Sequence, residues 1–123
     1  MRLKNKIAII TGSASGFGKG IAKKFTEEGA KLILVDINSN LLKKVSKSLN
    51  QDNFVADVSK DSNFKSLLKY SYKKYKTIDI IVNNAGITHK PKNMETVTNN
   101  EFDKVFKVNA KSVYLSAKYF VPK

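Results

Sequence analysis

Apolar residues along the chain fall into two kinds of segment. Short segments rich in apolar residues, typical of strands, lie at residues 7–11, 32–35, 53–56 and 78–82, and the first of them is a continuous apolar run before a glycine-rich turn. After each of them, apolar residues recur every three or four positions, which is the spacing of one face of a helix. These helical patterns cover residues 18–28, 41–49, 59–75 and 98–121. The pattern therefore predicts four strands and four helices in strict alternation.

Polar and glycine residues mark the ends of several of these helices. Gly29 follows the first helix, where a C-terminal glycine cap is expected, and Ser59 is a candidate N-cap for the third. Residues 98–101 (TNNE) have the spacing of a capping box and open the last helix. A loop containing His89 and Pro91 precedes it. The apolar stripe expected to bury this last helix consists of Phe102, Phe106, Val113, Ala117 and Phe120.

Alternation of strands and helices predicts an α/β fold with a parallel sheet and helices on both faces. Parallel strands need right-handed crossovers, so the doubly wound layout follows. We expect one domain over residues 1–123 that is truncated after four strands and four helices and incomplete at its C-terminus. The fourth strand and the last helix should then expose apolar surface. We therefore expect the isolated chain to be poorly stable or to self-associate.

Composition narrows the candidate partners. The net charge is +13, but the lysines are scattered over every predicted element and Arg2 is the single arginine. This distribution favours a solvated basic surface over nucleic-acid binding. A nucleic-acid-binding protein stays open as an alternative function. The sequence has no cysteine, which excludes disulfides and thiolate metal sites. With no apolar run of about 20 residues and no signal-peptide pattern, we expect a cytoplasmic protein without membrane association.

A glycine-rich turn, TGSASGFG at residues 11–18, joins the first strand to the first helix. Gly12 permits a tight turn, Gly16 lets a pyrophosphate approach the backbone, and Gly18 allows close packing of helix on strand. The first N–H groups of the helix would face the phosphates. Asp36 ends the second strand, where an acid accepts hydrogen bonds from the adenosine ribose. The alternative is a simple helix-entry turn, with Asp36 capping the next helix.

Asp36 also bears on the choice between the two nicotinamide dinucleotides. Its carboxylate would repel the 2′-phosphate of NADP, and no basic residue follows directly, since Ile37 and Asn38 come next. We therefore expect NAD as the cofactor, with NADP disfavoured.

The chain resembles the short-chain dehydrogenases/reductases of the classical type, in their N-terminal half. The glycine spacing has that family's form, and three further segments follow in the expected order: Asp57-Val58, the turn at residues 83–86 (NNAG), and Asn109. The resemblance covers essentially the whole chain. Within the family, the stretch from Gly86 onward is similar to the 3-oxoacyl-acyl-carrier-protein reductase and sugar dehydrogenase branches.

The resemblance implies a role for each matching residue. Asn109 would be the one member of the catalytic tetrad in this chain and would hold a water of the proton relay. No metal is implied. Asn83 and Asn84 would brace the sheet beneath the cofactor. The cofactor-binding residues implied are Gly12, Ser13, Ser15, Gly16, Phe17, Gly18, Asp36, Ile37, Asp57, Val58, Asn84, Ala85 and Gly86.

Purely structural alternatives stay open for some of these residues. Asn109 would then be a packed amide that bonds to neighbouring backbone, because a buried amide left without partners costs about 1–3 kcal/mol. Asp57 would cap a helix, and Asn83 and Asn84 would be turn residues that satisfy strand-end backbone.

The family's catalytic Ser and Tyr-x-x-x-Lys segment would lie beyond a fifth strand. Tyr-x-x-x-Lys spacing occurs four times here, which is expected on lysine-rich helix faces. Neither pair on the last helix has a serine a dozen residues upstream, since Phe102 and Lys107 stand there. We interpret all four as coincidental, and we assign no site to the lone His89. The pairs are Tyr70/Lys74, Tyr72/Lys76, Tyr114/Lys118 and Tyr119/Lys123.

Two functions follow from these observations. The first is an NAD-dependent oxidoreductase that moves hydride between nicotinamide and a secondary alcohol or ketone, represented here by its cofactor-binding half. The second is a non-catalytic dinucleotide-binding module. The resemblance further implies that the full-length form is a homo-oligomer, a dimer or tetramer, whose interface includes the last helix.

Overall fold

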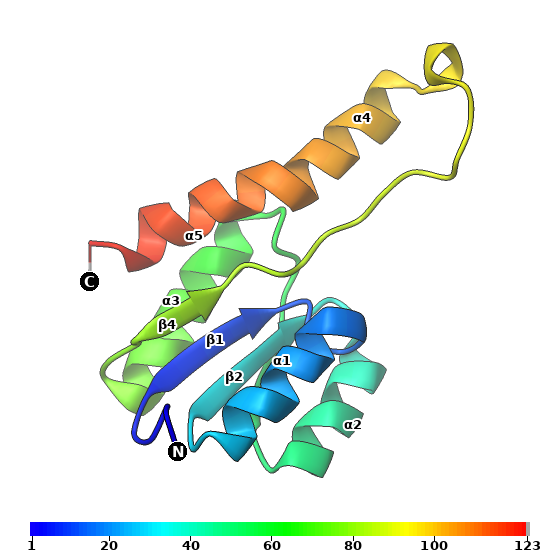
Figure 1. Ribbon diagram of the computed structural model, residues 1–123. Coiled ribbons are helices and arrows are strands. Elements are labelled where there is room, and N and C mark those ends of the chain that lie inside the picture. The colour runs from blue at the N-terminus through cyan, green and yellow to red at the C-terminus, as the bar shows by residue number, and fades with distance from the viewer. Residues whose placement is uncertain (123) are drawn as a thin grey trace.

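A parallel sheet lies at the centre of the computed structural model, which describes residues 1–122 (Figure 1). Within those residues the sheet has four strands in the order β3-β2-β1-β4, and each neighbouring pair is parallel. The predicted α/β doubly wound class is therefore confirmed. The strands are β1 (Ile7–Thr11), β2 (Lys31–Asp36), β3 (Asp52–Val55) and β4 (Ile80–Val82).

Helices connect the strands in the predicted order. The last predicted helix is one continuous run of three segments, α4, η2 and α5, in which η2 is a π-helical turn. No helix within residues 1–122 is both long and apolar enough to cross a membrane. The helices are α1 (Gly16–Glu27), α2 (Ser39–Leu49), α3 (Asp61–Tyr75), the short 3₁₀ turn η1 (Met94–Thr96), α4 (Asn99–Phe106), η2 (Lys107–Lys111) and α5 (Ser112–Phe120).

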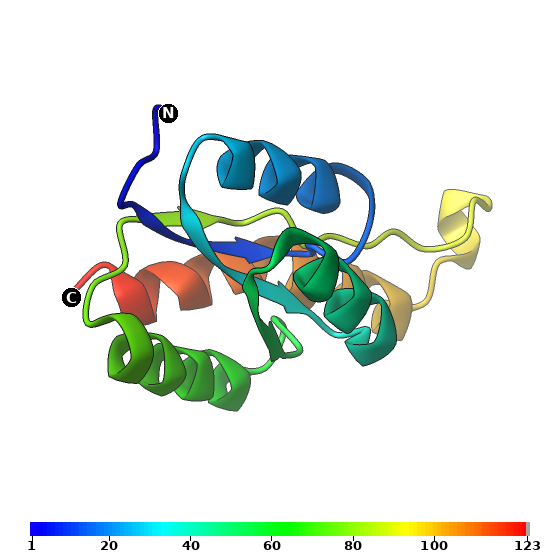
Figure 2. The ribbon, with the colours of Figure 1, turned by 90° about the horizontal axis from the view of Figure 1, so that it is seen from below.

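The core has two halves, one on each face of the sheet. Successive strand residues point to opposite faces, so Ala8 and Ile10 of β1 pack with α1 and α2, whereas Ile9 packs with α3 and α5. Figure 2 shows α1 on one side of the sheet and α3 and α5 on the other. The sheet is thus covered on both faces, which explains why its two central strands are continuous apolar runs.

The helix caps only partly follow the sequence prediction. Thr98 caps α4 as expected, since its Oγ1 accepts a hydrogen bond from the Glu101 N–H at 3.1 Å. The Glu101 carboxylate also pairs with Lys92 at 2.6 Å. The prediction that Ser59 caps α3 is wrong. The N-cap is Lys60, and the Ser59 hydroxyl donates instead to the Asp57 carboxylate at 2.6 Å.

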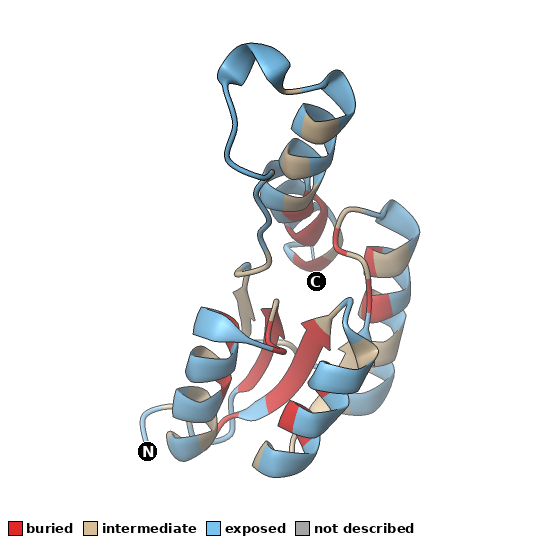
Figure 3. Ribbon diagram, turned by 90° about the vertical axis from the view of Figure 1, so that its right-hand side faces the viewer, coloured by how far each residue is buried: buried red, intermediate tan, exposed pale blue. Residues whose placement is uncertain are grey.

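The predicted apolar stripe of the last helix is also wrong for most of its length. Phe102 and Phe106 are 60% and 57% exposed, and Val113 is exposed as well. In Figure 3 the segment through η1 and α4 projects away from the sheet and carries no buried residue. The physical reason is that α5 packs on α3 through a different face, and the π-helical turn shifts the helical register between the two halves. That face consists of Ser112, Leu115, Ser116 and Phe120.

Candidate functional site

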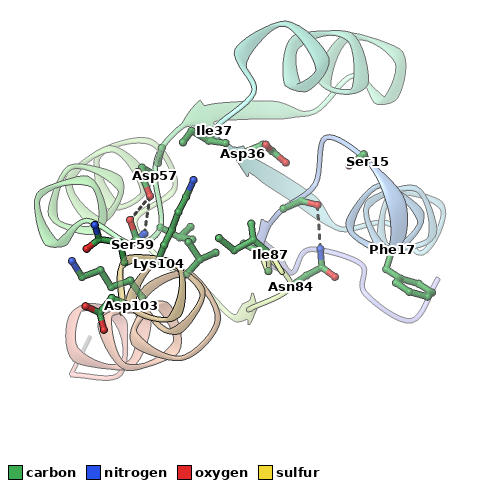
Figure 4. Close-up of a pocket in the computed structure, with 18 residues that line it drawn as sticks. Ser15, Phe17, Asp36, Ile37, Asp57, Ser59, Asn84, Ile87, Asp103 and Lys104 are labelled. Atoms are coloured by element: carbon green, nitrogen blue, oxygen red, sulfur yellow. Dashed lines mark hydrogen bonds between the residues drawn. The ribbon is translucent and has the colours of Figure 1, made fainter. Parts of the chain in front are cut away.

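A cavity of about 790 Å³ opens at the carboxyl ends of the strands (Figure 4). The chain proceeds from β1 to β2 and β3 on one side and places β4 on the other, so the strand order reverses beside β1. Open α/β sheets bind ligands at such a reversal. Residues that line the cavity come from the glycine turn, the ends of β2, β3 and β4, and the α4–η2 helix.

The glycine turn is fixed by close backbone approaches. Gly12 has a φ of +65°, and a Cβ there would lie 2.8 Å from the Cα of Ala85. A Cβ on Gly18 would lie 2.0 Å from the Gly12 carbonyl oxygen. Neither position admits a side chain without moving backbone, so the predicted tight turn and close helix packing are confirmed. Gly16 faces open space, with nothing within 4 Å of a Cβ.

Asn84 ties the glycine turn to the end of β4. Its Nδ2 donates to the carbonyl oxygens of Thr11 and Gly12 at 3.2 and 3.1 Å. The Thr11 hydroxyl oxygen accepts from the backbone N–H groups of Asn84 and Ala85, both at 3.1 Å. The bracing role expected of this turn is therefore confirmed for Asn84, whereas Asn83 is exposed.

The N-terminus of α1 is left open toward the cavity. Ser15, its N-cap, makes no side-chain capping bond, and no acidic residue stands in the first turn. By contrast, the side chains of Asn38 and Thr98 cap α2 and α4. The first N–H groups of a helix have no partner inside the helix and carry partial positive charge. This end of α1 therefore suits an anion, and the side-chain-free Gly16 lets a phosphate reach it.

Asp36, at the end of β2, is held in one orientation. One carboxylate oxygen accepts from the Ala14 N–H and the other from the Asn38 N–H, both at 3.0 Å. The group is half-buried and lines the cavity. A fixed carboxylate with remaining acceptor capacity can receive hydrogen bonds from a pair of vicinal hydroxyls. The cap of α2 is Asn38, so the alternative role of Asp36 as that helix's cap is not observed.

Asp57 stays ionised at the far end of the cavity. Burial would raise the pKa of its carboxyl group. The two hydrogen bonds from the Ser59 hydroxyl and N–H, together with the positive charges of Lys60 and Lys104, outweigh that effect and lower the pKa. Asp57 comes two residues after β3 and precedes the Lys60 N-cap of α3, so it forms a turn with Ser59 rather than capping the helix.

Asn109 lies in the π-helical turn and binds the loop that follows β4. Its Oδ1 accepts from the Ile87 N–H and its Nδ2 donates to the Ile87 carbonyl oxygen, both at 2.7 Å. The backbone-bonded arrangement considered above is therefore what the side chain adopts, although the residue is exposed rather than buried. A place in a proton relay stays a prediction. Single-turn π-helical insertions are frequent at functional sites, and nothing in the apolar spacing indicated this one.

The remaining predicted cofactor residues divide into two groups. Ser15, Phe17, Ile37, Val58, Ala85 and Gly86 line the cavity. Phe17 is 88% exposed and turns away from the cavity in Figure 4. Ser13 was expected to line the cavity but does not. Its buried hydroxyl donates to the Val35 carbonyl oxygen and holds the turn on β2. Gly16, Gly18 and Asn109 likewise lie outside the lining.

Sequence reasoning missed one wall of the cavity. The helical run from α4 into η2 supplies five lining residues that carry no motif. They depend on how α4 crosses the sheet, which residue spacing does not reveal. These residues are Asn100, Asp103, Lys104, Lys107 and Val108.

Two of the four tyrosines in Tyr-x-x-x-Lys spacing, Tyr70 and Tyr119, are not activated. Burial and a 2.6 Å hydrogen bond to Asp52 raise the pKa of Tyr70. A hydrogen bond to Asp61 raises the pKa of Tyr119. A tyrosine that exchanges protons near neutral pH needs a lowered pKa. For both residues this supports coincidental spacing. Lys123, the partner of Tyr119 in that spacing, lies outside the described residues.

The sequence matches the family described as short chain dehydrogenase over residues 6–123. The chain belongs to the short chain dehydrogenase family. Zerumbone synthase of Zingiber zerumbet is 42% identical over 97% of this chain. The 4-formylbenzenesulfonate dehydrogenase of Comamonas testosteroni is 37% identical over 99% of it. This chain covers 46% and 50% of those two proteins, so it spans about half the length of the curated relatives it matches.

Solved structures of the family superpose closely. The 3-ketoacyl-(acyl-carrier-protein) reductase from Brucella melitensis, complexed with NADH, gives a TM-score of 0.94 at 39% identity over 98% of this chain and 50% of its own. A short chain dehydrogenase/reductase from Burkholderia phymatum, in complex with NAD, gives 0.93 at 27% identity over 99% and 45%. The fold is thus the nicotinamide-dinucleotide Rossmann fold of this family.

Proposed function

We propose that this chain is the NAD-binding half of an oxidoreductase that moves hydride between nicotinamide and a secondary alcohol or ketone. The observation that carries the proposal is the fixed carboxylate of Asp36 at the end of β2, beside the open N-terminus of α1. A carboxylate there favours the ribose hydroxyls of NAD and repels the additional phosphate of NADP.

In this proposal four groups of residues each hold a different part of the cofactor. The N–H groups at the start of α1 hold the pyrophosphate, and Asp36 and Ile37 hold the adenosine ribose. Asp57 and Val58 hold the adenine. The turn that contains Asn84 supports the inner half of the cofactor. Hydrogen bonds hold this turn to Thr11, and Asn109 holds Ile87, which follows the turn. The bound nicotinamide supplies the hydride chemistry.

Proton transfer is assigned to the family's Ser and Tyr-x-x-x-Lys segment, outside these residues. The raised pKa values of Tyr70 and Tyr119 support that assignment. Asn109 would position the Ile87 turn beneath the cofactor. We also propose a homo-oligomer in the full-length form, joined through the exposed apolar residues of α4 and α5.

Calorimetric titration of the chain with NAD and with NADP tests the cofactor assignment. We expect NAD to bind more tightly than NADP. Asp36→Ala should weaken NAD by about 10- to 100-fold, because a hydrogen bond to a charged group contributes about 1.5–3 kcal/mol. The same variant should lose the preference over NADP. Glu27→Ala removes an exposed acid outside the cavity and serves as the control. An Asp36→Ala chain that keeps the preference would overturn the assignment.

The second candidate function is a non-catalytic dinucleotide-binding module. The absence of an activated tyrosine at Tyr70 and Tyr119 favours it for this chain taken alone. The two candidates separate when the full-length form, which would contain the proton-transfer segment, is mixed with NAD and secondary alcohols and reduction of the cofactor is followed. Binding without reduction supports the module, and reduction supports the oxidoreductase.

A further inference from the structure

Lys104 reaches into the cavity from its α4 wall. Its side chain extends from α4 between Asp57 and Ile87 and points toward Ile37, whereas the neighbouring Asp103 turns away (Figure 4). The lysine therefore spans the end of the cavity that is opposite the glycine turn. No sequence motif marks this position.

The charge of Lys104 is not committed to another side chain. Among residues 1–122, no ion pair involves Lys104, although six other lysine–carboxylate contacts are present. The positive charge of Lys104 helps to lower the pKa of Asp57, whose carboxylate already accepts two hydrogen bonds from Ser59. The lysine thus offers a cation and a four-carbon stem to whatever enters between α4 and the end of β3.

We propose that Lys104 is an adenine-clamping residue, with its stem and ammonium group lying over one face of the purine ring. The inference rests on the proposed function, which places adenine at Asp57 and Val58. Val58 is a buried apolar residue at that end, and the exposed apolar residue Ile37 lines the same cavity. Lys104 faces them across the cavity, and an ammonium over an aromatic face is attracted by the ring's π electrons. The flat ring would therefore lie between an apolar wall and a cation.

Two variants of Lys104 separate the contribution of the stem from that of the charge. Lys104→Met keeps most of the stem and removes the charge, and Lys104→Ala removes both. Lys111→Ala is the matched control, because Lys111 lies on the same helical run, outside the cavity lining. Circular dichroism and thermal melting check that every variant keeps the fold of the parent chain.

Binding is measured by calorimetry for NAD and by ligand-observed NMR titration for adenosine, AMP and nicotinamide mononucleotide. We expect Lys104→Ala to weaken NAD, AMP and adenosine alike by about two- to fivefold, as a cation–π contact at an exposed site contributes. Lys104→Met should give a smaller loss. Nicotinamide mononucleotide, which lacks adenine, should bind every variant as it binds the parent.

Three results would overturn the clamp. Unchanged adenosine binding with weakened AMP binding would mean that Lys104 contacts phosphate. Equal loss of nicotinamide mononucleotide binding would mean a general effect on the cavity. Unchanged NAD and adenosine affinity in Lys104→Ala would mean no contact at all. In these cases the parent chain still binds NAD, so the proposed function stands. A parent chain that binds no NAD removes the proposed function and the clamp together.

Discussion

Gly18 leaves no room for a methyl group where α1 begins. Its Cβ would lie 2.0 Å from the Gly12 carbonyl oxygen and 2.5 Å from the Asn84 amide nitrogen. We expect Gly18→Ala to destabilise the chain by about 2–3 kcal/mol, the cost of forcing atoms into a packed site. Gly20→Ala is the control. Its Cβ meets nothing within 4 Å, so a helical alanine should be neutral or slightly stabilising. Urea unfolding measures both, and equal stabilities would contradict the close approach.

Sequence reasoning succeeded for residues whose role is set by local backbone. Gly12, Gly18 and Asp36 each occupy the place expected of them, because turn geometry and strand ends depend on a few neighbouring residues. It failed for Ser13, whose buried hydroxyl bonds to the Val35 carbonyl oxygen of β2 instead of lining the cavity. It also gave no sign of Lys104, which reaches the cavity only because α4 crosses it.

At the scale of elements, Asp79 fastens the start of β4 to β1. Its carboxylate accepts from the Ile7 N–H at 2.9 Å and pairs with Lys6 at 3.3 Å. Those bonds lower its pKa below the usual 3.8, the Ile7 hydrogen bond contributing most. A lowered folded-state pKa gives stability that is present above the unfolded-state pKa and is lost as the pH falls through the folded-state value.

We therefore expect Asp79→Asn to lower the melting temperature at neutral pH, and the difference from the parent to shrink below about pH 4. Thermal melts at a series of pH values between neutral and about 2 follow this convergence. Asp103→Asn removes an exposed carboxylate that forms no ion pair within residues 1–122 and should leave the melting temperature unchanged. A deficit in Asp79→Asn that persists at the lowest pH would contradict the link to ionisation.

Element boundaries illustrate what residue spacing can and cannot reveal. All four strands were predicted within about two residues, because each leaves a short segment rich in apolar residues, although only β1 and β2 are buried along most of their length. The first and last residues of the last helix were predicted correctly to within about one residue, but the face that it packs against α3 was not. It has apolar residues on two faces, and spacing alone cannot tell which face meets α3. The π-helical turn at Lys107–Lys111, which moves the register between α4 and α5, was not foreseen.

At the scale of the whole molecule, the fold class followed from alternation of strands and helices, and the family from motif order. Neither observation predicted how much apolar surface the folded chain would expose to solvent. Exposed apolar side chains lie along α4 and α5 and directly after α5, and we call them the apolar face: Phe102, Phe106, Val113, Tyr114 and Val121. The rings of Phe102 and Phe106 stack with their centroids 6.1 Å apart. Contiguous apolar surface of this kind marks interaction sites on proteins.

We expect this face to make the chain self-associate. Sedimentation velocity should show a dimer or larger species at micromolar concentrations, and Phe102→Ser with Phe106→Ser should shift it toward monomer. Because both rings are exposed in the single chain, the double variant should keep the parent's circular dichroism spectrum. Phe17→Ser removes an even more exposed phenylalanine from another surface and should leave association unchanged. A parent chain that sediments as a monomer and unfolds in one sharp calorimetric transition would contradict self-association through this face.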